Sequence, residues 1–501
     1  MNAITHYLTP YGLEQFSGAA WGTRDVSQGP IEFLLSLEKF EAAREVLMTI
    51  FANQNPVGDW AQWWMFDSYS HIRAGDCHGD VYYWVIISLA SYVKVTGDVK
   101  VLDEKVPYFG GSELFTINEH VERLIKMIED SYIGETALVP FGGGDWNDSL
   151  QPKNEDLAKR LISSWTVEMN YQAFSEYVEV YEKAGNLQRA NELTEVVKQI
   201  KADFNKYLVK DNVVAGYGYV EDDGNINVLL HPTDKHTGIK YSLLPMDRGI
   251  LSGIFTKEQA EFHQIIIDKH LKGPDGARLM DKPLKYKGGI QEIFQRAESS
   301  TFFGREIGLM YIHEHIRYAE SQAVMGKADE FVKALRQAIP VNYKEIVPNS
   351  NLRQANCYYS SSDVTFKTRY DADEKYGDVI SGKMRVDGGW RVYSSGPGIY
   401  VSLIIKKLIG FRAFNDYVVI DPVLTNEMDN MKASFKFKGY YLNWNFKVKS
   451  GNYAPKNIIV NGTNVPFETE DNPYRTGGAI ISMKMFLSSL KSGDNEINVM
   501  I

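Results

Sequence analysis

The spacing of apolar residues predicts that the first four-fifths of the chain is helical. Apolar residues recur every three or four positions, with charges between them, in residues 33–51 and 114–131, which is the pattern of amphipathic helices. Residues 79–96 are apolar on nearly every side and predict a buried helix. Further helices are predicted at residues 157–184, 187–208, 257–271, 305–324, 328–338 and 399–409.

The pattern changes after Phe411, where short segments alternate polar and apolar residues or are rich in β-branched side chains. The segment KASFKFKGYYLNWNFKVKS alternates as a sheet with one solvated face does. Strands are predicted at residues 418–424, 433–437, 440–448, 457–460, 479–486 and 496–501. We therefore expect a helical domain over residues 1–412 and a small β-rich domain over residues 413–501.

Many helices joined by loops that hold the unusual residues predict a mainly α fold, an (α/α)6-barrel-type catalytic domain followed by a C-terminal β-sandwich-like domain. The functional site is then expected in the central depression of the barrel. Such a barrel needs about twelve helices, and the pattern shows only nine or ten. We therefore expect the chain to lack the first barrel helix.

Composition narrows the classes of partner. The formal net charge of −10 argues against a nucleic-acid or anionic-membrane partner. No apolar run approaches the roughly 20 residues of a membrane helix, and the N-terminus lacks the basic and apolar regions of a secretory signal, so a cytoplasmic location is expected. The two cysteines, Cys77 and Cys357, exclude a disulfide framework and a cysteine-rich zinc module.

The motif FGGGDWNDSLQP, residues 141–152, is the strongest candidate for chemistry. Three consecutive glycines allow a tight turn and a close approach to a ligand. Asp145 could orient the loop while Asp148 protonates a leaving oxygen, with Trp146 walling the site and lowering its dielectric. The alternative is a turn in which both aspartates cap the next helix.

Five further motifs accompany this loop in order along the chain. They are HYLTPYGLEQFSGAAWGTRDVSQGP, GDWAQWWMFDSYSHIRAGDCHGDVYYW, RAESSTFFGREIGLMYIHEHIRYAES, LRQANCYYSSSD and GGWRVYSSGPGIY. Together the motifs resemble glycoside hydrolase family 94, the inverting phosphorylases of β-glucosides, and they are most similar to its 1,2-β-oligoglucan phosphorylase branch. The resemblance covers nearly the whole chain.

The resemblance implies a role for particular residues. It implies that Asp148 is the general acid, and that phosphate is bound by His313, Ser395 and Gly396, the last two at a helix start, where anions are favoured. It also implies a set of residues that bind the sugar, namely Arg24, Asp25, Gln28, Arg73, Asp80, Asp145 and Trp146. Taken one by one, His313 and His315 could instead be core histidines, Arg24–Asp25 a structural ion pair, and Ser395 a helix cap.

The implied reaction is phosphorolysis of β-linked gluco-oligosaccharides to α-glucose 1-phosphate and a shortened glucan. Inorganic phosphate is the co-substrate, and no metal or organic cofactor is implied. An inverting phosphorylase needs only the acid, because phosphate is already an anion and attacks directly. An inverting hydrolase would need a second carboxylate as base, for which Glu314 and Asp363 are candidates.

Two departures from the family pattern affect these expectations. Residues 1–22 contain no Lys or Arg, although cellobiose-type members carry a phosphate-binding cation there, so Arg296 or Arg305 could substitute. The family's N-terminal β-sandwich has no counterpart in this sequence. We therefore keep open an inactive or sugar-binding remnant, a homodimer, and a partner fragment that supplies the missing region.

Overall fold

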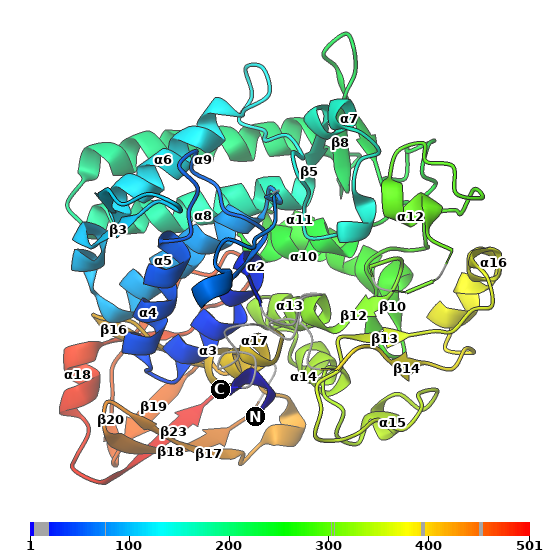
Figure 1. Ribbon diagram of the computed structural model, residues 1–501. Helices are drawn as coiled ribbons and strands as arrows, with labels where there is room; N and C mark the ends of the chain where they lie inside the picture. The colour runs from blue at the N-terminus through cyan, green and yellow to red at the C-terminus, as the bar shows by residue number, and fades with distance from the viewer. Residues whose placement is uncertain (5–19, 76, 302, 305, 392–395, 450–453) are drawn as a thin grey trace.

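The computed structural model describes residues 1–4, 20–75, 77–301, 303–304, 306–391, 396–449 and 454–501. Helices make up most of the first 410 residues, and the strands of the last 90 residues form a layer beneath them (Figure 1). Each part has its own apolar core: one is built from the helices, and the other is centred on Phe411, Leu442, Trp444 and Phe486. The fold is mainly α with a β-rich C-terminal part.

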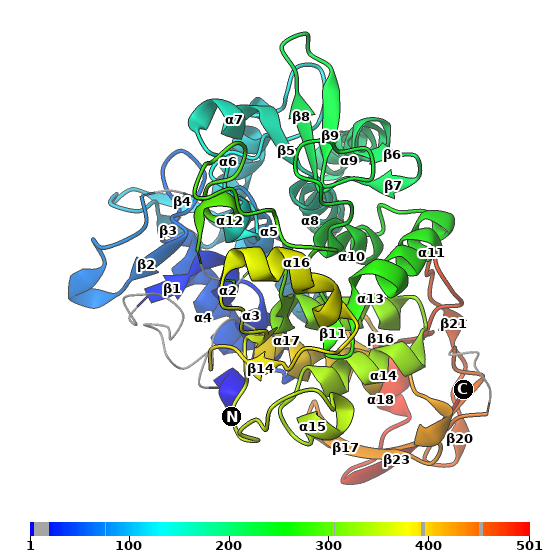
Figure 2. The ribbon, with the colours of Figure 1, turned by 90° about the vertical axis from the view of Figure 1, so that its right-hand side faces the viewer.

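Six helices form a closed ring in which each contacts the next and the last contacts the first. In ring order they are α3 (Gly29–Ser36), α5 (Val81–Thr96), α8 (Ser164–Lys183), α10 (Leu243–Leu251), α13 (Ile312–Val324) and α17 (Gly396–Leu403). Figure 2 shows these six helices around a common centre. Outside them lie α4 (Phe40–Phe51), α6 (Ile117–Asp130), α9 (Leu187–Tyr207), α11 (Lys257–Ile266) and α14 (Ala328–Gln337) (Figure 2).

Local sequence signals explain where several helices begin. Thr116 and Glu119 form a reciprocal capping box at the start of α6, and Thr256 and Gln259 do the same for α11. Asn154 caps the short helix α7 (Glu155–Arg160), because its side chain accepts a hydrogen bond from the amide of Leu157.

Two predicted helices are wrong because the chain breaks inside them. Residues 33–51 divide into α3 and α4 at Glu38, whose φ of 55° lies in the left-handed region. Residues 157–184 divide because β5 (Leu161–Ser163) leaves the helical path to pair with β8 (Tyr217–Val220). Periodicity alone could not show that a β-ladder partner fifty residues away would interrupt the helix.

The C-terminal part contains two sheets. One has the strand order β15 (Phe411–Ala413), β16 (Tyr417–Ile420), β22 (Ala479–Ser482), β21 (Glu468–Thr469). The other has the order β17 (Lys432–Phe437), β18 (Tyr440–Lys447), β23 (Asp494–Met500), β19 (Asn457–Val460), β20 (Thr463–Asn464). The predicted strand 479–486 is half wrong, because Ser482 ends β22 and caps α18 (Met483–Ser488).

Polar contacts join the β-rich part to the helices. Arg475 pairs with Asp421 at 2.9 Å and also donates to the carbonyl oxygen of Val324 at the end of α13. The hydroxyl of Tyr474 donates to the carbonyl oxygen of Ile250 in α10 at 3.1 Å. These bonds hold the C-terminal layer against the ends of two ring helices.

Short strands and helices at one end of the ring carry most of the motifs. They include β1 (Ala20–Gly22) with β2 (Trp63–Met65), α2 (Thr23–Val26), α12 (Gln295–Ser299), α16 (Arg369–Ile380), and the sheet β12 (Met310–Tyr311), β13 (Ser361–Asp363), β14 (Asp387–Gly388). The remaining short elements are β3 (Lys105–Pro107), β4 (Leu114–Thr116), β6 (Val209–Lys210), β7 (Val213–Val214), β9 (Ile226–Leu229), β10 (Lys272–Gly273), β11 (Gly276–Ala277) and α15 (Tyr343–Ile346).

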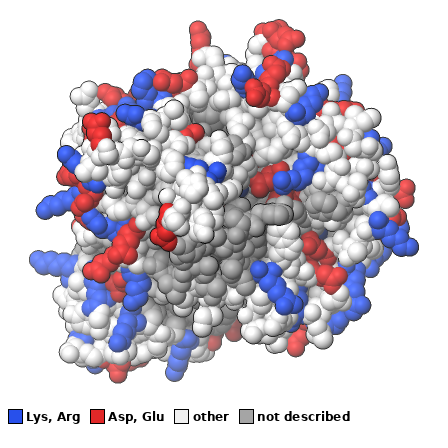
Figure 3. Space-filling view, in the orientation of Figure 1, with Lys and Arg blue, Asp and Glu red and all other residues white. Residues whose placement is uncertain are grey.

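Acidic and basic side chains are interspersed on the face of the molecule shown in Figure 3. Among the described residues, none of the helices has both the length and the apolar character needed to cross a membrane.

The close contact between α17 and α3 allows the packing of the ring to be tested by mutation. A Cβ atom added at Gly398 would lie 2.3 Å from the carbonyl oxygen of Gly29, whereas one added at Gly377 in α16 would meet nothing within 4 Å. We expect Gly398→Ala to lower the free energy of unfolding by about 1–3 kcal/mol through overpacking. Gly377→Ala, the matched control, should leave it unchanged or raise it by up to about 1 kcal/mol. Urea unfolding measures both, and equal effects would contradict the close contact.

Candidate active site

The glycine loop runs directly against the segment that precedes α5. His78 forms an isolated β-bridge with Gly142, and the amide of Gly79 donates to the carbonyl oxygen of Gly144 at 2.7 Å. A Cβ atom added at Gly143 would lie 2.1 Å from the carbonyl oxygen of Cys77. The loop needs glycine because its backbone touches another backbone, so the close approach inferred from the three glycines is to protein.

Asp145 is buried and holds the loop from inside. Its carboxylate accepts hydrogen bonds from the amide of Asn147 at 2.8 Å and from the hydroxyls of Ser163 and Tyr217, each at 2.9 Å. Burial raises the pKa of Asp145 from 3.8 to about 7. With both carboxylate oxygens bonded inside the protein, the geometry favours the loop-orienting role and not a direct contact of Asp145 with sugar.

Asp148 is the carboxylate of this loop that remains accessible. It begins the short 3₁₀ turn η3 (Asp148–Leu150), and the side chain of Asn147 accepts from the amide and hydroxyl of Ser149 to cap that turn. The idea that both aspartates are merely caps is wrong, because Asn147 and Asn154 do the capping. The side chain of Asp148 is 25% exposed, and its Oδ1 has no hydrogen-bond partner among the described residues.

Arg24 contacts two other segments of the chain, residues 78–80 and 145–148, and so lies beside Asp148. Its Nη2 donates to Oδ1 of Asp80 at 2.6 Å and to the carbonyl oxygen of Asp145 at 3.0 Å, and it lies 3.0 Å from Nδ1 of His78. Its Nη1 lies 3.8 Å from Oδ1 of Asp148, and Nδ1 of His78 lies 3.4 Å from the same oxygen. Asp80 is fully buried at the start of α5, so the ion-pair partner of Arg24 is Asp80 and not its neighbour Asp25.

A second polar group surrounds Gln28. Its Oε1 accepts from Nη2 of Arg317 at 3.3 Å and lies 3.2 Å from Nε2 of His313, while its Nε2 donates to the carbonyl oxygen of Arg24 at 3.2 Å. Arginine can only donate, so the amide orientation of Gln28 is fixed and Nε2 of His313 must carry the proton. Arg317 is itself held by Glu32 at 2.5 Å.

Trp146 joins the two polar groups. Its ring meets that of Tyr311 edge-on at 5.1 Å between centroids and lies 5.9 Å from the ring of His313. The structure therefore brings the Asp148 loop beside His313, although the two are more than 160 residues apart in the sequence.

The first turn of α17 lies close to Gln28. Gly398 packs on Gly29, the residue after Gln28, and α17 also contacts α13, the helix that carries His313. Gly396, the first residue of α17, is buried, and a Cβ atom added there would lie 2.2 Å from the hydroxyl of Tyr358. Ser395 lies outside the described residues, as does Arg305.

Two of the predicted sugar-binding residues lie at the edge of this arrangement. Asp25 is half-buried in α2, and its carbonyl oxygen accepts from the amide of Gln28 at 3.3 Å. The guanidinium of Arg73 lies 3.7 Å from the centroid of the Phe109 ring and donates to the carbonyl oxygen of Asn53 at 3.0 Å. The contacts of Arg73 are therefore with these two residues and not with the group around Arg24.

The histidines of the YIHEH motif have different roles. His315 is fully buried, accepts from the amide of Ala277 at 3.2 Å, and donates to the carbonyl oxygen of Ala334 at 3.0 Å. Burial lowers the pKa of His315 to about 4, so it is a neutral core histidine, as its place on an apolar helix allowed. His313, two residues earlier, faces Gln28 and Trp146 instead.

Two residues of the site were not predicted from the sequence. His78 comes within reach of Asp148 because the glycine loop pairs with its backbone. Arg317 lies one helical turn after His313, so the spacing of four residues could have indicated it. No group of three or more potential metal ligands is found among the described residues.

The raised pKa of Asp145 gives a pH-dependent prediction. The folded state binds this proton more tightly than the unfolded state, so the contribution of Asp145 to stability is complete below about pH 4 and is lost as the pH rises through about 7. Asparagine does not ionise. Between pH 4 and pH 8, the free energy of unfolding of Asp145→Asn relative to wild type should therefore rise, by about 2–4 kcal/mol. Urea unfolding at both values tests this, and a pH-independent difference would contradict it.

Comparison with known proteins adds independent information. Residues 22–377 match the family model for the glycosyl hydrolase 94 superfamily catalytic domain, and residues 410–500 match the glycoside phosphorylase C-terminal domain. A 1,2-beta-oligoglucan phosphorylase of Listeria innocua is 42% identical over 96% of this chain and 44% of its own length. An N,N'-diacetylchitobiose phosphorylase of Vibrio proteolyticus is 20% identical over 76% of this chain and 44% of its own length.

A third relative, a 3-O-beta-D-glucopyranosyl-beta-D-glucuronide phosphorylase of Paenibacillus borealis, is 25% identical over 79% of this chain and 48% of its own length. The chain thus spans less than half the length of these relatives. Four of the six motifs that carried the resemblance lie wholly within the first match, HYLTPYGLEQFSGAAWGTRDVSQGP lies partly within it, and GGWRVYSSGPGIY lies between the two matches. The chain belongs to the glycosyl hydrolase 94 superfamily.

Proposed function

We propose that the chain carries the catalytic part of an inverting phosphorylase that acts on β-1,2-linked gluco-oligosaccharides, with Asp148 as general acid. The observation that carries the proposal is the placement of Asp148. Its side chain is 25% exposed and lies beside Arg24, and Trp146 of the same loop lies near the ring of His313. The activity and linkage follow the Listeria innocua relative, which is named a 1,2-beta-oligoglucan phosphorylase.

The closed ring of helices supports an (α/α)6 barrel as the frame of the site. Five helices lie outside the six of the ring, in agreement with a barrel that lacks one outer helix among the described residues. The strands that begin at Phe411 support a C-terminal β-sandwich-like domain, with a domain boundary near residue 412. Polar residues at the N-terminal ends of the ring helices then line the central depression.

Asp148 protonates the glycosidic oxygen in the proposed mechanism. Phosphate attacks the anomeric carbon from the opposite face, the bond from that carbon to the glycosidic oxygen breaks, and the products are α-glucose 1-phosphate and a shortened glucan. One carboxylic acid is enough because the attacking group is already an anion. Inorganic phosphate is thus a co-substrate, and the mechanism requires no other cofactor.

Phosphate is held by His313, by Ser395 and by the backbone amide of Gly396 at the start of α17. A helix N-terminus offers unpaired amides and a favourable potential to an anion. Because Nε2 of His313 donates to Gln28, Nδ1 is the ring nitrogen left to face phosphate. Arg317 donates to the same oxygen of Gln28, but Glu32 and Glu320 balance its charge, so Arg296 and Arg305 remain the candidates for an additional phosphate-binding cation.

The glucose unit to be transferred is bound by Arg24, Asp25 and Gln28, with Trp146 as an apolar wall. Asp80 positions Arg24, and Asp145 positions the loop from below. Arg73, held against Phe109, shapes the outer edge of the same end.

Hydrolysis is less well supported because the candidate bases are poorly placed. Glu314 is 2% exposed, and its nearest charged groups are Arg248 and Arg317 inside the ring. Asp363 lies in β13, where burial raises its pKa to about 6. Glu314 is shut off from water, and among the described residues no hydrogen bond or ion pair links Asp363 to the group around Arg24 and Asp148.

Dependence on phosphate is the direct test of the proposed function. With β-1,2-gluco-oligosaccharides as substrate, the protein should release α-glucose 1-phosphate in the presence of phosphate and no sugar in its absence. Chromatography of the products measures both. Free glucose released without phosphate would show a hydrolase, and the absence of both products, with sugar still bound, would show a sugar-binding protein.

Asp148→Asn is the variant that assigns the acid. It should reduce turnover by about two to four orders of magnitude, because an amide cannot give up a proton to the leaving oxygen. Asp471→Asn, which changes an exposed carboxylate of the C-terminal part, is the matched control and should keep full activity. Turnover of Asp148→Asn within a factor of a few of wild type would remove Asp148 from its role.

A further inference from the structure

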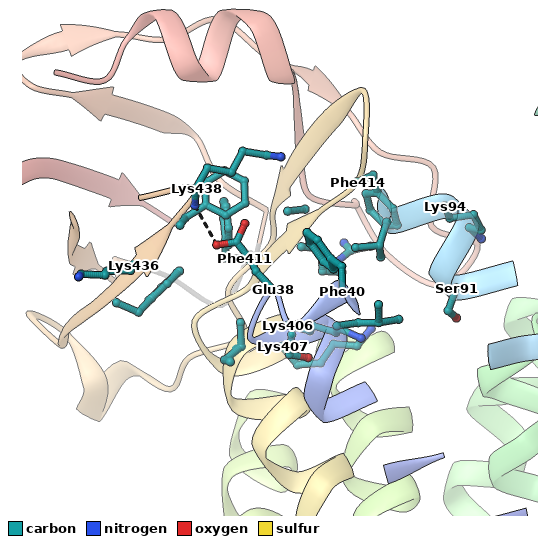
Figure 4. A pocket seen from close by; sticks show the side chains of 18 of the residues that line it. Glu38, Phe40, Ser91, Lys94, Lys406, Lys407, Phe411, Phe414, Lys436 and Lys438 are labelled. Atoms are coloured by element: carbon teal, nitrogen blue, oxygen red, sulfur yellow. Dashed lines mark hydrogen bonds between the residues drawn. The ribbon is translucent and has the colours of Figure 1, made fainter. Parts of the chain in front are cut away.

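A cavity of about 230 Å³ lies between the helices and the C-terminal β-rich part, away from the site just described. Its lining comes from the ends of α3 and α5, the turn after α17, and strands β15 and β17 (Figure 4). The active-site residues lie at the N-terminal ends of the same helices. Asp80 and Lys94 stand at opposite ends of α5, which at 1.5 Å per residue places them about 20 Å apart.

The cavity concentrates positive charge in an otherwise acidic chain. Six cationic side chains line it against two carboxylates, Glu38 and Glu320, although the net charge of the chain is −10. The cations are Lys94, Lys406, Lys407, Arg412, Lys436 and Lys438. An excess of one sign in an enclosed space strengthens the local field felt by an anion.

Most of these charges already have partners. Lys94 pairs with Glu179 at 3.2 Å, Arg412 with Glu470 at 2.6 Å, and Lys436 lies over the ring of Tyr441. Glu320 is bound to Arg317 at 2.8 Å, and Glu38 accepts from the backbone amide of Lys438 at 2.8 Å. The hydrogen bonds of these two carboxylates thus go to groups other than Lys406 and Lys407.

Lys406 and Lys407 differ from the other cations. Within the part of the chain that the structure describes, neither ammonium group has a hydrogen-bond or ion-pair partner, and burial lowers the pKa of both. Both lie in the wide π-helical turn η5 (Ile404–Leu408), a feature frequent at functional sites. Glu320 acts on both lysines from a distance, yet burial still lowers the pKa of each, so an anion in the cavity would stabilise both ammonium groups.

A second cavity, of about 210 Å³, extends the space toward the ring helices. The two cavities share Leu35, Ser91, Glu320, Lys406 and Lys407, so the two lysines stand where the cavities meet. The second cavity is also lined by Arg248 and Arg317. A ligand at the lysines therefore has room on both sides.

Aromatic rings form the apolar wall of the first cavity. The rings belong to Phe40, Phe411, Phe414, Phe435 and Phe437, and Figure 4 shows Phe40 close to Lys406 and Lys407 and Phe414 toward Lys94. A sugar ring presents a flat C–H face that packs on aromatic rings, while ammonium groups bind phosphate oxygens. The volume suits a small ligand and not an oligosaccharide.

We propose that this cavity binds a hexose phosphate, with the phosphate on Lys406 and Lys407 and the sugar ring against the phenylalanines. The site is separate from the one that carries out catalysis and does not require that reaction. If the proposed function also holds, its product α-glucose 1-phosphate is a ligand of this class. Occupancy of the cavity, which lies between the helices and the C-terminal part, would then depend on the concentration of this product.

Calorimetric titration with α-glucose 1-phosphate tests the site without any turnover. The His313→Gln variant, in which the proposed phosphate site is weakened, should still bind the ligand through the lysines. Adding Lys406→Met and Lys407→Met to that variant should weaken the remaining binding at least tenfold. Lys333→Met, an exposed lysine of α14, is the matched control and should leave it unchanged. Binding that is indifferent to both lysine substitutions would overturn the proposal.

Two further measurements separate the ligand chemistry and the folding of the variants. Glucose should not bind this site and orthophosphate should bind at least tenfold more weakly than the sugar phosphate; equal affinity for orthophosphate would contradict the role of the phenylalanine wall.

Lys406→Met and Lys407→Met, made singly, should each unfold at the same temperature as wild type or higher without ligand, because each loses an unpaired ammonium. Each should lose the thermal shift that the sugar phosphate gives wild type, and a retained shift would contradict the proposal.

Discussion

The hydrogen bonds of one guanidinium group organise the candidate site. Arg24 binds Asp80, His78 and the backbone of Asp145, and its second nitrogen faces Asp148. These partners come from two segments that are remote from Arg24 in the sequence. Because Nη2 of Arg24 bonds to both of these segments, it fixes their position relative to its own segment. The place of the accessible carboxylate follows from that docking.

The same logic extends from Arg24 to the other half of the site. Gln28, four residues after Arg24, donates to the carbonyl oxygen of Arg24, and its own side-chain oxygen contacts Arg317 and His313. Glu32, another turn along, binds Arg317. The segment from Arg24 to Glu32, which runs from α2 into α3, thus sets the distance between the acid and the proposed phosphate site, and the fit of Gly398 on Gly29 fixes α17 against it.

The sequence was sufficient to predict the parts of this arrangement that depend on local chemistry. Three glycines predicted a close backbone approach, and the alternating pattern after Phe411 predicted the C-terminal strands. Contacts between distant segments could not be read in this way. His78 and Arg317 were missed because their roles depend on partners in other segments, and the helix break at residues 161–163 depends on a strand some fifty residues later. The resemblance implied that Asp145 contacts the sugar, because the burial of a side chain cannot be read from a sequence motif.

The central claim is that Arg24 acts through Asp148, and a double-mutant cycle on the turnover number measures this directly. Turnover by wild type, Arg24→Lys, Asp148→Asn and the double variant gives the coupling free energy between the two residues. Lysine keeps the charge but lacks the planar fork that reaches Asp80 and Asp148 from two different nitrogens. Arg24→Lys should therefore slow wild type at least tenfold and have almost no further effect once Asp148 is absent. Effects of the two substitutions that multiply independently would contradict the account.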